Sequence, residues 1–158
     1  MLSIFFHSST IFFVGIGVKY FRNISLLINE RRFTMQAVYE FIEKCGTYYL
    51  ATVDGDQARV RPFGTINLFN NRLYIQTGKK KDVSKQIQAN NKVELCCFNP
   101  EEGKWLRLSG ELLRDESYEA KKSMLDKYPH LRGMYSEEDD NTEVLFFVNM
   151  TANFSSFE

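Results

Sequence analysis

The chain has 158 residues, 44% of them hydrophobic and 25% charged, a composition typical of one folded domain with its own core. Lysine plus arginine and aspartate plus glutamate both number 20, so no charge excess indicates binding to nucleic acid or to a membrane. The histidines are His7 and His130 alone, which argues against a histidine-based metal site or a serine–histidine relay.

Cysteine usage indicates the compartment. The three cysteines are Cys45, Cys96 and Cys97, an odd number, and adjacent residues on a strand point to opposite faces. A disulfide framework is therefore not expected, and we expect a reducing, cytoplasmic location.

The first 34 residues differ from the rest. The stretch MLSIFFHSSTIFFVGIGVKYF is apolar but interrupted, too short for a spanning helix, and lacks the features of a signal peptide. One interpretation is a loosely packed extension. The other is a translated leader, because in a bacterial gene Arg31-Arg32 can be encoded AGG-AGG, a ribosome-binding sequence placed before Met35. We expect the leader, with residues 1–34 outside the fold and the domain at residues 35–158.

The first predicted elements of the domain are a helix and a hairpin. Helical spacing of Val38, Phe41 and Ile42 predicts a helix over MQAVYEFIEKC, and Gly46 closes it. TYYLATV then predicts a strand, DGDQ a turn with Asp-Gly chemistry, and ARVRPFGTINLF the partner strand of the hairpin.

Turn and cap residues delimit the next elements. Asn70-Asn71 predicts a turn, because asparagine tolerates positive φ, and RLYIQT predicts a strand that ends at Thr77-Gly78. KKKDVSKQIQANN predicts a helix with Asp82 in its first turn.

The second half of the domain continues in the same way. KVELCCF predicts a strand, NPEEG a turn and KWLRLSGELLRD a strand. SYEAKKSMLDKYP predicts a helix with Ser117 as its N-cap, followed by the acidic loop SEEDDN and the closing strand EVLFFVNMTANFSSF.

These elements predict a mainly β fold with peripheral helices. Tight turns join most strands, so the sheet is expected to be largely antiparallel, and six aromatic-rich strands can close into a small barrel. The βαβ alternation and the glycine fingerprint of a parallel dinucleotide-binding sheet are missing from the sequence.

Two basic groups are candidates for binding an anion. Arg59 and Arg61 in ARVRPFG point to the same face of an extended chain, where their charges repel unless an anion lies on that face. TGKKK at 77–81 follows a strand and opens a helix, whose N-terminus favours an anion, and Gly78 permits close approach of the backbone. In a meander the two groups can lie side by side, and a dianionic phosphate fits both.

Structural alternatives exist for both groups. The two arginines can instead be salt-bridge partners at the rim of the sheet, with Asp54, Asp56 or Glu94. A run of lysines is usually a solvated face. The residues alone therefore leave a phosphate-ligand site as one of several interpretations.

A resemblance to a known family narrows these alternatives. YYLATVDGDQARVRPFG, LYIQTGKKKDVSKQIQANNKVELCCF and GKWLRLSGE resemble the pyridoxamine 5'-phosphate oxidase-like, FMN-binding split-barrel family, in its short-chain branch near the nitroimidazole-resistance flavoproteins. The resemblance covers nearly all of residues 35–157. It implies a six-stranded antiparallel split β-barrel and a homodimer, with FMN in each of two clefts between the subunits.

The resemblance also implies the cofactor-binding residues. The strand carrying the arginine pair would run along the flavin. Its proline, which has no N–H to donate to the sheet, would lie beside the ring. The residues that open the following helix would hold the phosphate. Trp105 would lie near the flavin or the dimer seam, or would be a core or interface aromatic. The implied set, with no catalytic residue and no metal ligand, is Arg59, Val60, Arg61, Pro62, Thr77, Gly78, Lys80, Lys81 and Trp105.

Two departures from the family pattern bear on the reaction. Pyridoxamine phosphate oxidases proper carry a C-terminal segment with arginine and histidine for the substrate phosphate, but this chain has no histidine after His130. Many nitroimidazole-resistance members have a histidine just after the strand proline, where this chain has Phe63-Gly64. True pyridoxamine phosphate oxidase activity is therefore not expected.

The implied function is an FMN-dependent oxidoreductase that reduces nitroaromatic or quinone-type acceptors with electrons from NAD(P)H. No residue stands out as an acid or base, and hydride chemistry on the flavin needs none. One alternative is a flavin- or haem-binding stress or sensor module without turnover. Another is a β-barrel dimer whose basic cleft binds some other anion. No nucleic acid or membrane partner is expected.

Overall fold

The computed structural model describes residues 2–5 and 34–157. Most of the leader interpretation concerns residues 1 and 6–33, which lie outside the described residues. Within the described ranges, no helix has the length and apolar character needed to cross a bilayer. The elements are β1 (Leu2–Phe5), α2 (Met35–Cys45), β2 (Tyr48–Asp54), β3 (Gln57–Phe63), β4 (Asn67–Phe69), β5 (Arg72–Gly78), α3 (Asp82–Ala89), β6 (Lys92–Asn99), β7 (Lys104–Asp115), α4 (Tyr118–Lys127), the 3-10 helix η1 (Pro129–Gly133) and β8 (Thr142–Ser156).

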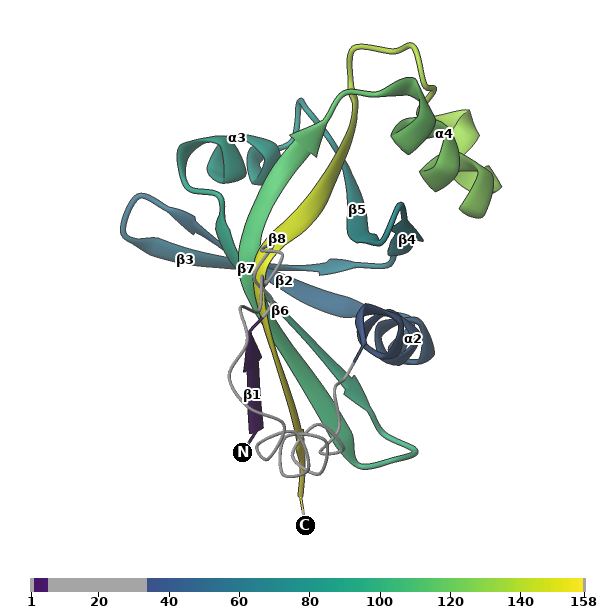
Figure 1. The fold of residues 1–158 in the computed structure, drawn as a ribbon. Helices are drawn as coiled ribbons and strands as arrows, with labels where there is room; N and C mark the ends of the chain where they lie inside the picture. The colour runs from purple at the N-terminus through teal and green to yellow at the C-terminus, as the bar shows by residue number, and fades with distance from the viewer. Residues whose placement is uncertain (1, 6–33, 158) are drawn as a thin grey trace, which may run out of the picture.

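The strands form one antiparallel sheet in the order β3-β2-β6-β7-β8-β5-β4, and β1 pairs with β8 off this path (Figure 1). The register of the two longest strands, β7 and β8, shifts between Ser109 and Glu111, opposite Asn149, which has a φ of 51°. At this bulge a Cβ on Gly110 would lie 3.0 Å from the carbonyl oxygen of Val148. A bulge increases the local bend and twist of a strand pair, so it helps the sheet to curl.

The predicted strand ARVRPFGTINLF is divided into two strands. β3 pairs with β2, β4 pairs with β5, and residues 64–66 connect β3 to β4. Since β3 and β4 lie at opposite ends of the strand order, the chain here passes from one edge of the sheet to the other. The expectation of six strands is thus corrected to seven between residues 48 and 156, and the barrel is open between its two edges.

Local predictions at turns and caps are confirmed. Asn70 and Asn71 have φ values of 48° and 57°, the backbone of a tight hairpin turn. The Ser117 hydroxyl accepts a hydrogen bond from the Ala120 N–H at 3.3 Å and caps α4. The 3-10 helix η1, which begins at Pro129, was not predicted, because the stretch PHLRG has no apolar periodicity.

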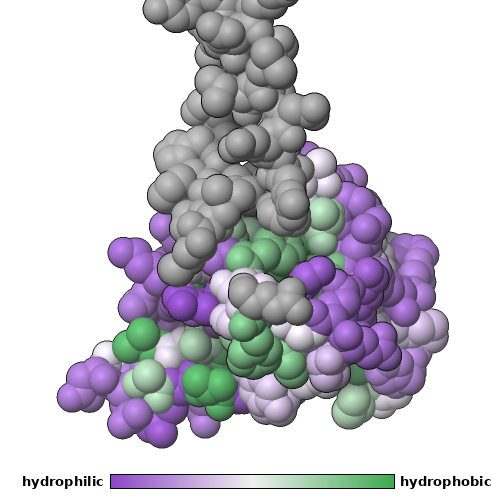
Figure 2. Space-filling model, turned by 90° about the horizontal axis from the view of Figure 1, so that it is seen from below, coloured by the Kyte–Doolittle hydropathy of each residue, from purple (hydrophilic) through white to green (hydrophobic). Residues whose placement is uncertain are grey.

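Apolar side chains are exposed on the outer side of the sheet. Tyr49 on β2, Val60 on β3 and Phe98 on β6 are 54%, 63% and 45% exposed. The register sets Tyr49 opposite both Pro62 and Cys96, so these strands share one outward face. We call these five residues the outer apolar face. Seen from below, hydrophobic residues lie in patches between hydrophilic ones on the surface of the protein (Figure 2).

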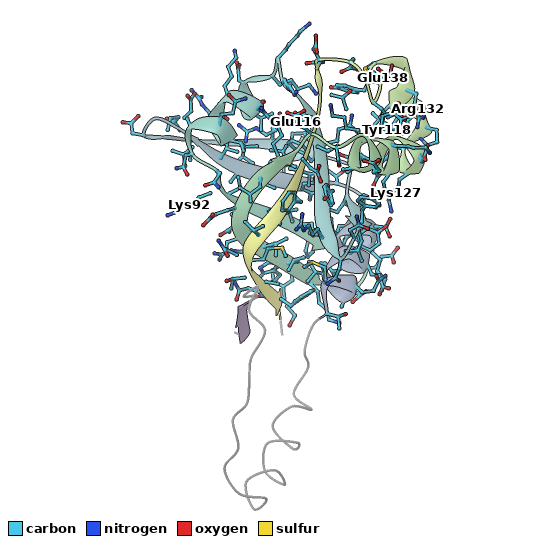
Figure 3. All side chains as sticks on the ribbon, turned by 45° about the horizontal axis from the view of Figure 1, so that its top comes forward. Lys92, Glu116, Tyr118, Lys127, Arg132 and Glu138 are labelled. Atoms are coloured by element: carbon cyan, nitrogen blue, oxygen red, sulfur yellow. The ribbon has the colours of Figure 1, made fainter. Side chains whose placement is uncertain are left out.

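Lys127 joins two helices that are far apart in the sequence. Its ammonium group donates hydrogen bonds to the Tyr39 hydroxyl and the Glu43 carboxylate of α2, and it lies 4.5 Å from the centroid of the Tyr39 ring. Figure 3 labels Lys127 on α4. Both helices also contact β4. Lys127 therefore ties α4 and α2 together over the short edge strand.

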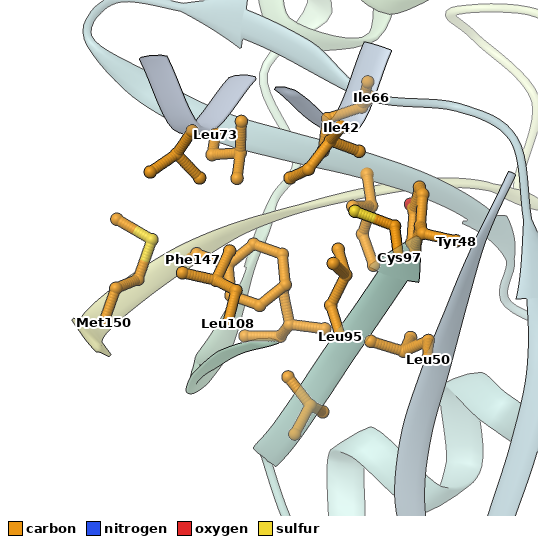
Figure 4. Packing of buried hydrophobic residues seen from close by; sticks show 14 of the residues in the cluster. Ile42, Tyr48, Leu50, Ile66, Leu73, Leu95, Cys97, Leu108, Phe147 and Met150 are labelled. Atoms are coloured by element: carbon orange, nitrogen blue, oxygen red, sulfur yellow. The ribbon is translucent and has the colours of Figure 1, made fainter. Parts of the chain in front are cut away.

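The main hydrophobic core lies inside the barrel (Figure 4). Leu50 of β2, Leu95 of β6 and Leu108 of β7 are fully buried, and each such side chain contributes about 1.5–3 kcal/mol through its burial. The buried Tyr48 hydroxyl donates a hydrogen bond to the Thr65 carbonyl at 2.7 Å. That bond fixes the connection between β3 and β4 to the core, and so positions one wall of the opening.

Candidate functional site

A cavity of about 360 Å³ lies at the opening between the edge strand β3 and the part of β5 that extends beyond its pairing with β4. Its walls come from the end of β3, the end of β5, the start of α3, and η1 with the residues after it. Within the described residues, β3 and the part of β5 after Tyr74 have no strand partner on this side. The lining residues are Arg61, Pro62, Phe63, Gly64, Thr65, Gln76, Thr77, Lys81, Val83, Leu131, Met134 and Tyr135.

Arg61 is held in the cavity wall by uncharged groups. Its Nη1 donates to Thr52 Oγ1 at 2.6 Å, to the Leu50 carbonyl at 3.1 Å and to the Arg59 carbonyl at 3.3 Å, and its Nη2 donates to Gln86 Oε1 at 2.6 Å. The Nε–H and the second Nη2–H, which form the side-on fork of the guanidinium, have no partner among the described residues. This fork suits two oxygens of one anion.

Arg59 has a different environment. Its Nε and Nη2 both lie 3.1 Å from Asp54 Oδ2, in an ion pair about half exposed to solvent. A salt bridge at the rim of the sheet was one of the alternatives that the sequence allowed, and the structure shows it for Arg59 but not for Arg61. Burial and the neighbouring charge of Arg59 lower the pKa of Arg61. Among the described residues no carboxylate pairs with Arg61, so this part of the cavity wall is cationic.

Lys81 supplies a second cation to the same cavity. It is the N-cap residue of α3, exposed, and forms no ion pair within the described part of the chain. The N–H groups of Asp82 and Val83, the first two of the helix, also have no hydrogen-bond partner among the described residues. An anion beside Lys81 would therefore meet a favourable helix end.

The loop before α3 is less available than its sequence suggests. The Lys79 N–H donates to the Asn141 carbonyl at 2.8 Å and the Lys80 N–H donates to Asn141 Oδ1 at 3.1 Å. The Lys81 N–H donates to the Gly78 carbonyl at 3.0 Å. These three N–H groups are thus used by the fold and are not available to a ligand.

Gly78 permits a close approach of another part of the chain. A Cβ at this position would lie 3.1 Å from the Asn141 side chain and 3.2 Å from the Tyr135 hydroxyl. A side chain at residue 78 would therefore crowd Asn141 and Tyr135 in the segment before β8.

The structure brings together four of the nine predicted site residues. Arg61, Pro62, Thr77 and Lys81 line the cavity. Arg59, Val60, Gly78 and Lys80 flank it in the chain but do not line it. Trp105 is not among the lining residues, and its ring lies 5.1 Å from that of Phe157.

Gln76 and Thr77 have unpaired polar atoms in the cavity wall. The two residues are 5% and 3% exposed. Among the described residues, neither end of the Gln76 amide nor the Thr77 hydroxyl has a hydrogen-bond partner. A buried polar group without a partner costs about 1–3 kcal/mol, so a ligand that supplied partners would be favoured.

Sequence reasoning missed several lining residues. Leu131, Met134 and Tyr135 form a largely apolar wall, and Met134 is 69% exposed. No motif in the stretch LRGMY marks this wall, because its position depends on the unpredicted turn of η1. Gln76 was missed as well, since its place beside the opening follows from where β4 stops pairing with β5.

Comparison with known proteins assigns the family. The family model described as pyridoxamine 5'-phosphate oxidase matches residues 34–151, a range that contains every strand from β2 to β7 and most of β8. The chain belongs to the pyridoxamine 5'-phosphate oxidase family. A solved NimC/NimA family protein from Clostridium acetobutylicum is 40% identical, with a TM-score of 0.75, over 78% of this chain and 86% of that one. The predicted resemblance is therefore confirmed.

More distant members of the fold agree with the predicted architecture. General Stress Protein 26 from Bacillus anthracis is 16% identical with a TM-score of 0.56, over 75% of this chain and 99% of that one. A haem-binding protein from Mycobacterium smegmatis is 11% identical with a TM-score of 0.56, over 73% and 57%. At such identities the likeness shows the fold alone, and the mainly antiparallel split barrel is confirmed. No curated protein matches the chain.

Proposed function

We propose that this pyridoxamine 5'-phosphate oxidase family protein binds FMN at the barrel opening and acts as an FMN-dependent oxidoreductase. The observation that supports this most directly is the environment of Arg61, whose charge no carboxylate offsets and whose side-on fork has no partner among the described residues. Lys81 and the start of α3 line the same cavity. A phosphate dianion is the ligand that such a pair of cations favours.

The remaining lining suits a flavin ring. Pro62, Phe63 and Gly64 offer an apolar strand end, and Leu131 and Met134 offer further apolar surface. The unpaired amide of Gln76 can both donate and accept hydrogen bonds. An isoalloxazine ring has apolar faces and a polar edge, so the residues present fit this cofactor.

The chemistry that we propose is electron transfer to small acceptors of nitroaromatic or quinone type, with NAD(P)H as donor. Bound FMN would supply the hydride chemistry, and the protein would bind and orient the reactants. We assign no acid or base among the described residues that line the cavity, because hydride chemistry on a flavin needs none. The apolar wall of Leu131 and Met134 supports an uncharged acceptor.

We further propose that the protein is a homodimer in the cytoplasm. The outer apolar face has the composition of an interface, and it includes Val60 and Pro62 on the same edge strand as Arg61. A partner packed on this face would lie next to the cavity wall, as expected for a shared cleft. The free thiols of Cys45, Cys96 and Cys97 support a reducing compartment.

The test is a spectrum of the purified protein, before and after incubation with FMN, followed by anaerobic titration with NAD(P)H. We expect flavin absorption, FMN as the released flavin, bleaching by NAD(P)H, and recovery of colour on addition of a nitroaromatic or a quinone. Flavin that no nicotinamide donor bleaches would indicate a binding module without turnover. A haem spectrum, or no retained flavin, would contradict the proposal.

A further inference from the structure

One buried side chain, that of Gln86, is hydrogen-bonded directly to the Arg61 guanidinium. Gln86, on the second turn of α3, is 8% exposed, and its Oε1 accepts hydrogen bonds from Arg61 Nη2 and from the Thr52 hydroxyl, both at 2.6 Å. Thr52 is 2% exposed and accepts from Arg61 Nη1 at 2.6 Å. Arg61, Thr52 and Gln86 thus form a closed triangle of hydrogen bonds.

The orientation of the Gln86 amide follows from its neighbours. If the amide were reversed, its NH₂ group would face the donating guanidinium and the donating hydroxyl of Thr52. The oxygen must therefore point to Arg61. This arrangement uses the end-on fork of the guanidinium, formed by Nη1 and Nη2, and leaves the side-on fork of Nε and Nη2 for another acceptor.

For the binding of an anion by Arg61, the lack of charge on Gln86 matters as much as its hydrogen bonds. Most arginines that are partly removed from water are paired with a carboxylate, as Arg59 is with Asp54. Gln86 supplies the same acceptor geometry without a negative charge. The guanidinium is then fixed in direction while its charge stays available to a ligand.

We propose that Gln86 is a positioning residue that sets the selectivity of the cavity for a phosphate-bearing flavin over the same flavin without phosphate. This inference rests on the proposed function, and it adds a residue that does not line the cavity and would act through Arg61. Gln86 also connects α3, which carries Lys81 at its start, to β3. A single side chain therefore holds both cations of the site in one arrangement.

Replacing Gln86 with glutamate changes the charge of residue 86 but keeps an acceptor oxygen for Arg61. In Gln86→Glu the acceptor remains but carries a negative charge, so Arg61 would form an internal ion pair. FMN should then bind about tenfold to a hundredfold more weakly, the usual effect of losing a charge-assisted contact. The affinity for riboflavin should stay within about twofold, and the flavin-free protein should melt at the same or a higher temperature.

The matched control is Gln88→Glu, the same substitution two residues along the same helix. Gln88 is exposed, its amide donates to the Ser84 hydroxyl at 3.4 Å, and residues two apart on a helix point in different directions. Gln88→Glu should leave the ratio of FMN affinity to riboflavin affinity unchanged. Gln86→Leu, which removes the acceptor, should weaken FMN more than riboflavin and also lower the melting temperature.

The measurement is the dissociation constant of FMN and of riboflavin for each variant, by quenching of flavin fluorescence, together with thermal unfolding without flavin. Wild-type protein that binds FMN no more tightly than riboflavin would overturn the proposed function itself. Wild-type protein that discriminates, with Gln86→Glu discriminating equally well, would overturn the role of Gln86 alone. Equal loss of both flavins in Gln86→Glu, or the same loss in Gln88→Glu, would also overturn it.

Discussion

Arg59 and Arg61 are separated by one residue on the same face of β3, yet within the described part of the chain Arg59 is paired with a carboxylate and Arg61 is not. Arg59 contacts Asp54 at 3.1 Å, whereas Arg61 donates to oxygens of Thr52, Gln86 and the backbone. Two adjacent like charges would ordinarily both be neutralised by the fold. The protein leaves one of them uncompensated at the edge of a cavity, which is the arrangement expected of an anion-binding residue.

The first prediction concerns the two cations of the cavity. Replacing Arg61 or Lys81 with alanine should weaken FMN binding by about 1.5–3 kcal/mol, the cost of losing a charge-assisted hydrogen bond. Riboflavin, which lacks the phosphate, should be nearly unaffected. The double variant should lose less than the sum of the single variants, because both side chains act on one dianion. Titration calorimetry with both flavins measures these differences.

The control for this experiment is Lys85→Ala. Lys85 also lies on α3, but it is exposed and paired with Asp82 at 3.0 Å, so its removal should leave FMN affinity unchanged. If Arg61→Ala weakens both flavins to the same extent, then Arg61 serves the barrel and the phosphate lies elsewhere.

The second prediction concerns the outer apolar face. Tyr49→Glu should convert the dimer to a monomer, because it places a charge in the middle of this face, opposite Pro62 and Cys96. Tyr118→Glu is the matched control: Tyr118 is 49% exposed, similar to Tyr49 at 54%, but lies on α4 (Figure 3). Sedimentation velocity at micromolar concentration distinguishes the two variants. A wild-type monomer that binds FMN tightly would contradict a shared cleft.

The third prediction concerns acid stability. Asp139 accepts hydrogen bonds from the Ser136 N–H at 2.6 Å, from the Asn141 N–H at 2.8 Å, from the Thr142 N–H and from the Thr142 hydroxyl at 2.9 Å. Burial acts to raise its pKa, but these hydrogen bonds together outweigh burial and lower the pKa from 3.8 to about 2. Because the folded pKa is depressed, the stabilisation is present above pH 3.8 and is lost as the pH falls to about 2.

The variant that tests this is Asp139→Asn. It should lower the melting temperature at neutral pH and lose less further stability than wild type between pH 3.8 and about 2. Thermal unfolding of both proteins across this range gives the difference directly. If the melting temperatures of the two proteins fall in parallel as the pH is lowered, Asp139 does not contribute to the loss of stability in acid.

The fourth prediction concerns the N-terminal residues. A chain that begins at Met35 should keep the oligomeric state and nearly all the stability of the full chain. It loses the pairing of Leu2–Phe5 with β8 and the Thr34 cap of α2, and a lost cap costs about 1 kcal/mol. Calorimetry should show a fall in melting temperature of no more than about 4 °C. A much larger fall would contradict the leader interpretation.

Local chemistry was sufficient to determine most elements from the sequence alone. Asn70-Asn71 determined a turn through their tolerance of positive φ, Ser117 determined a helix start, and residues 104–115 and the last strand were predicted almost to the residue. The split-barrel resemblance followed from motifs carried by contiguous segments. Such features depend on residues near one another in the chain, so the sequence contains them directly.

Tertiary structure decided which of the predicted site residues meet. The division of residues 57–69 into β3 and β4 depends on which strands are available as partners, and it creates the opening that holds the cavity. The different roles of Arg59 and Arg61 depend on Asp54 and Gln86, and Gln86 lies 25 residues from Arg61 in the sequence. Period-two alternation places both arginines on one face. Only the folded chain determines which of them meets a carboxylate and which meets a neutral amide, because that choice depends on how α3 packs against the sheet.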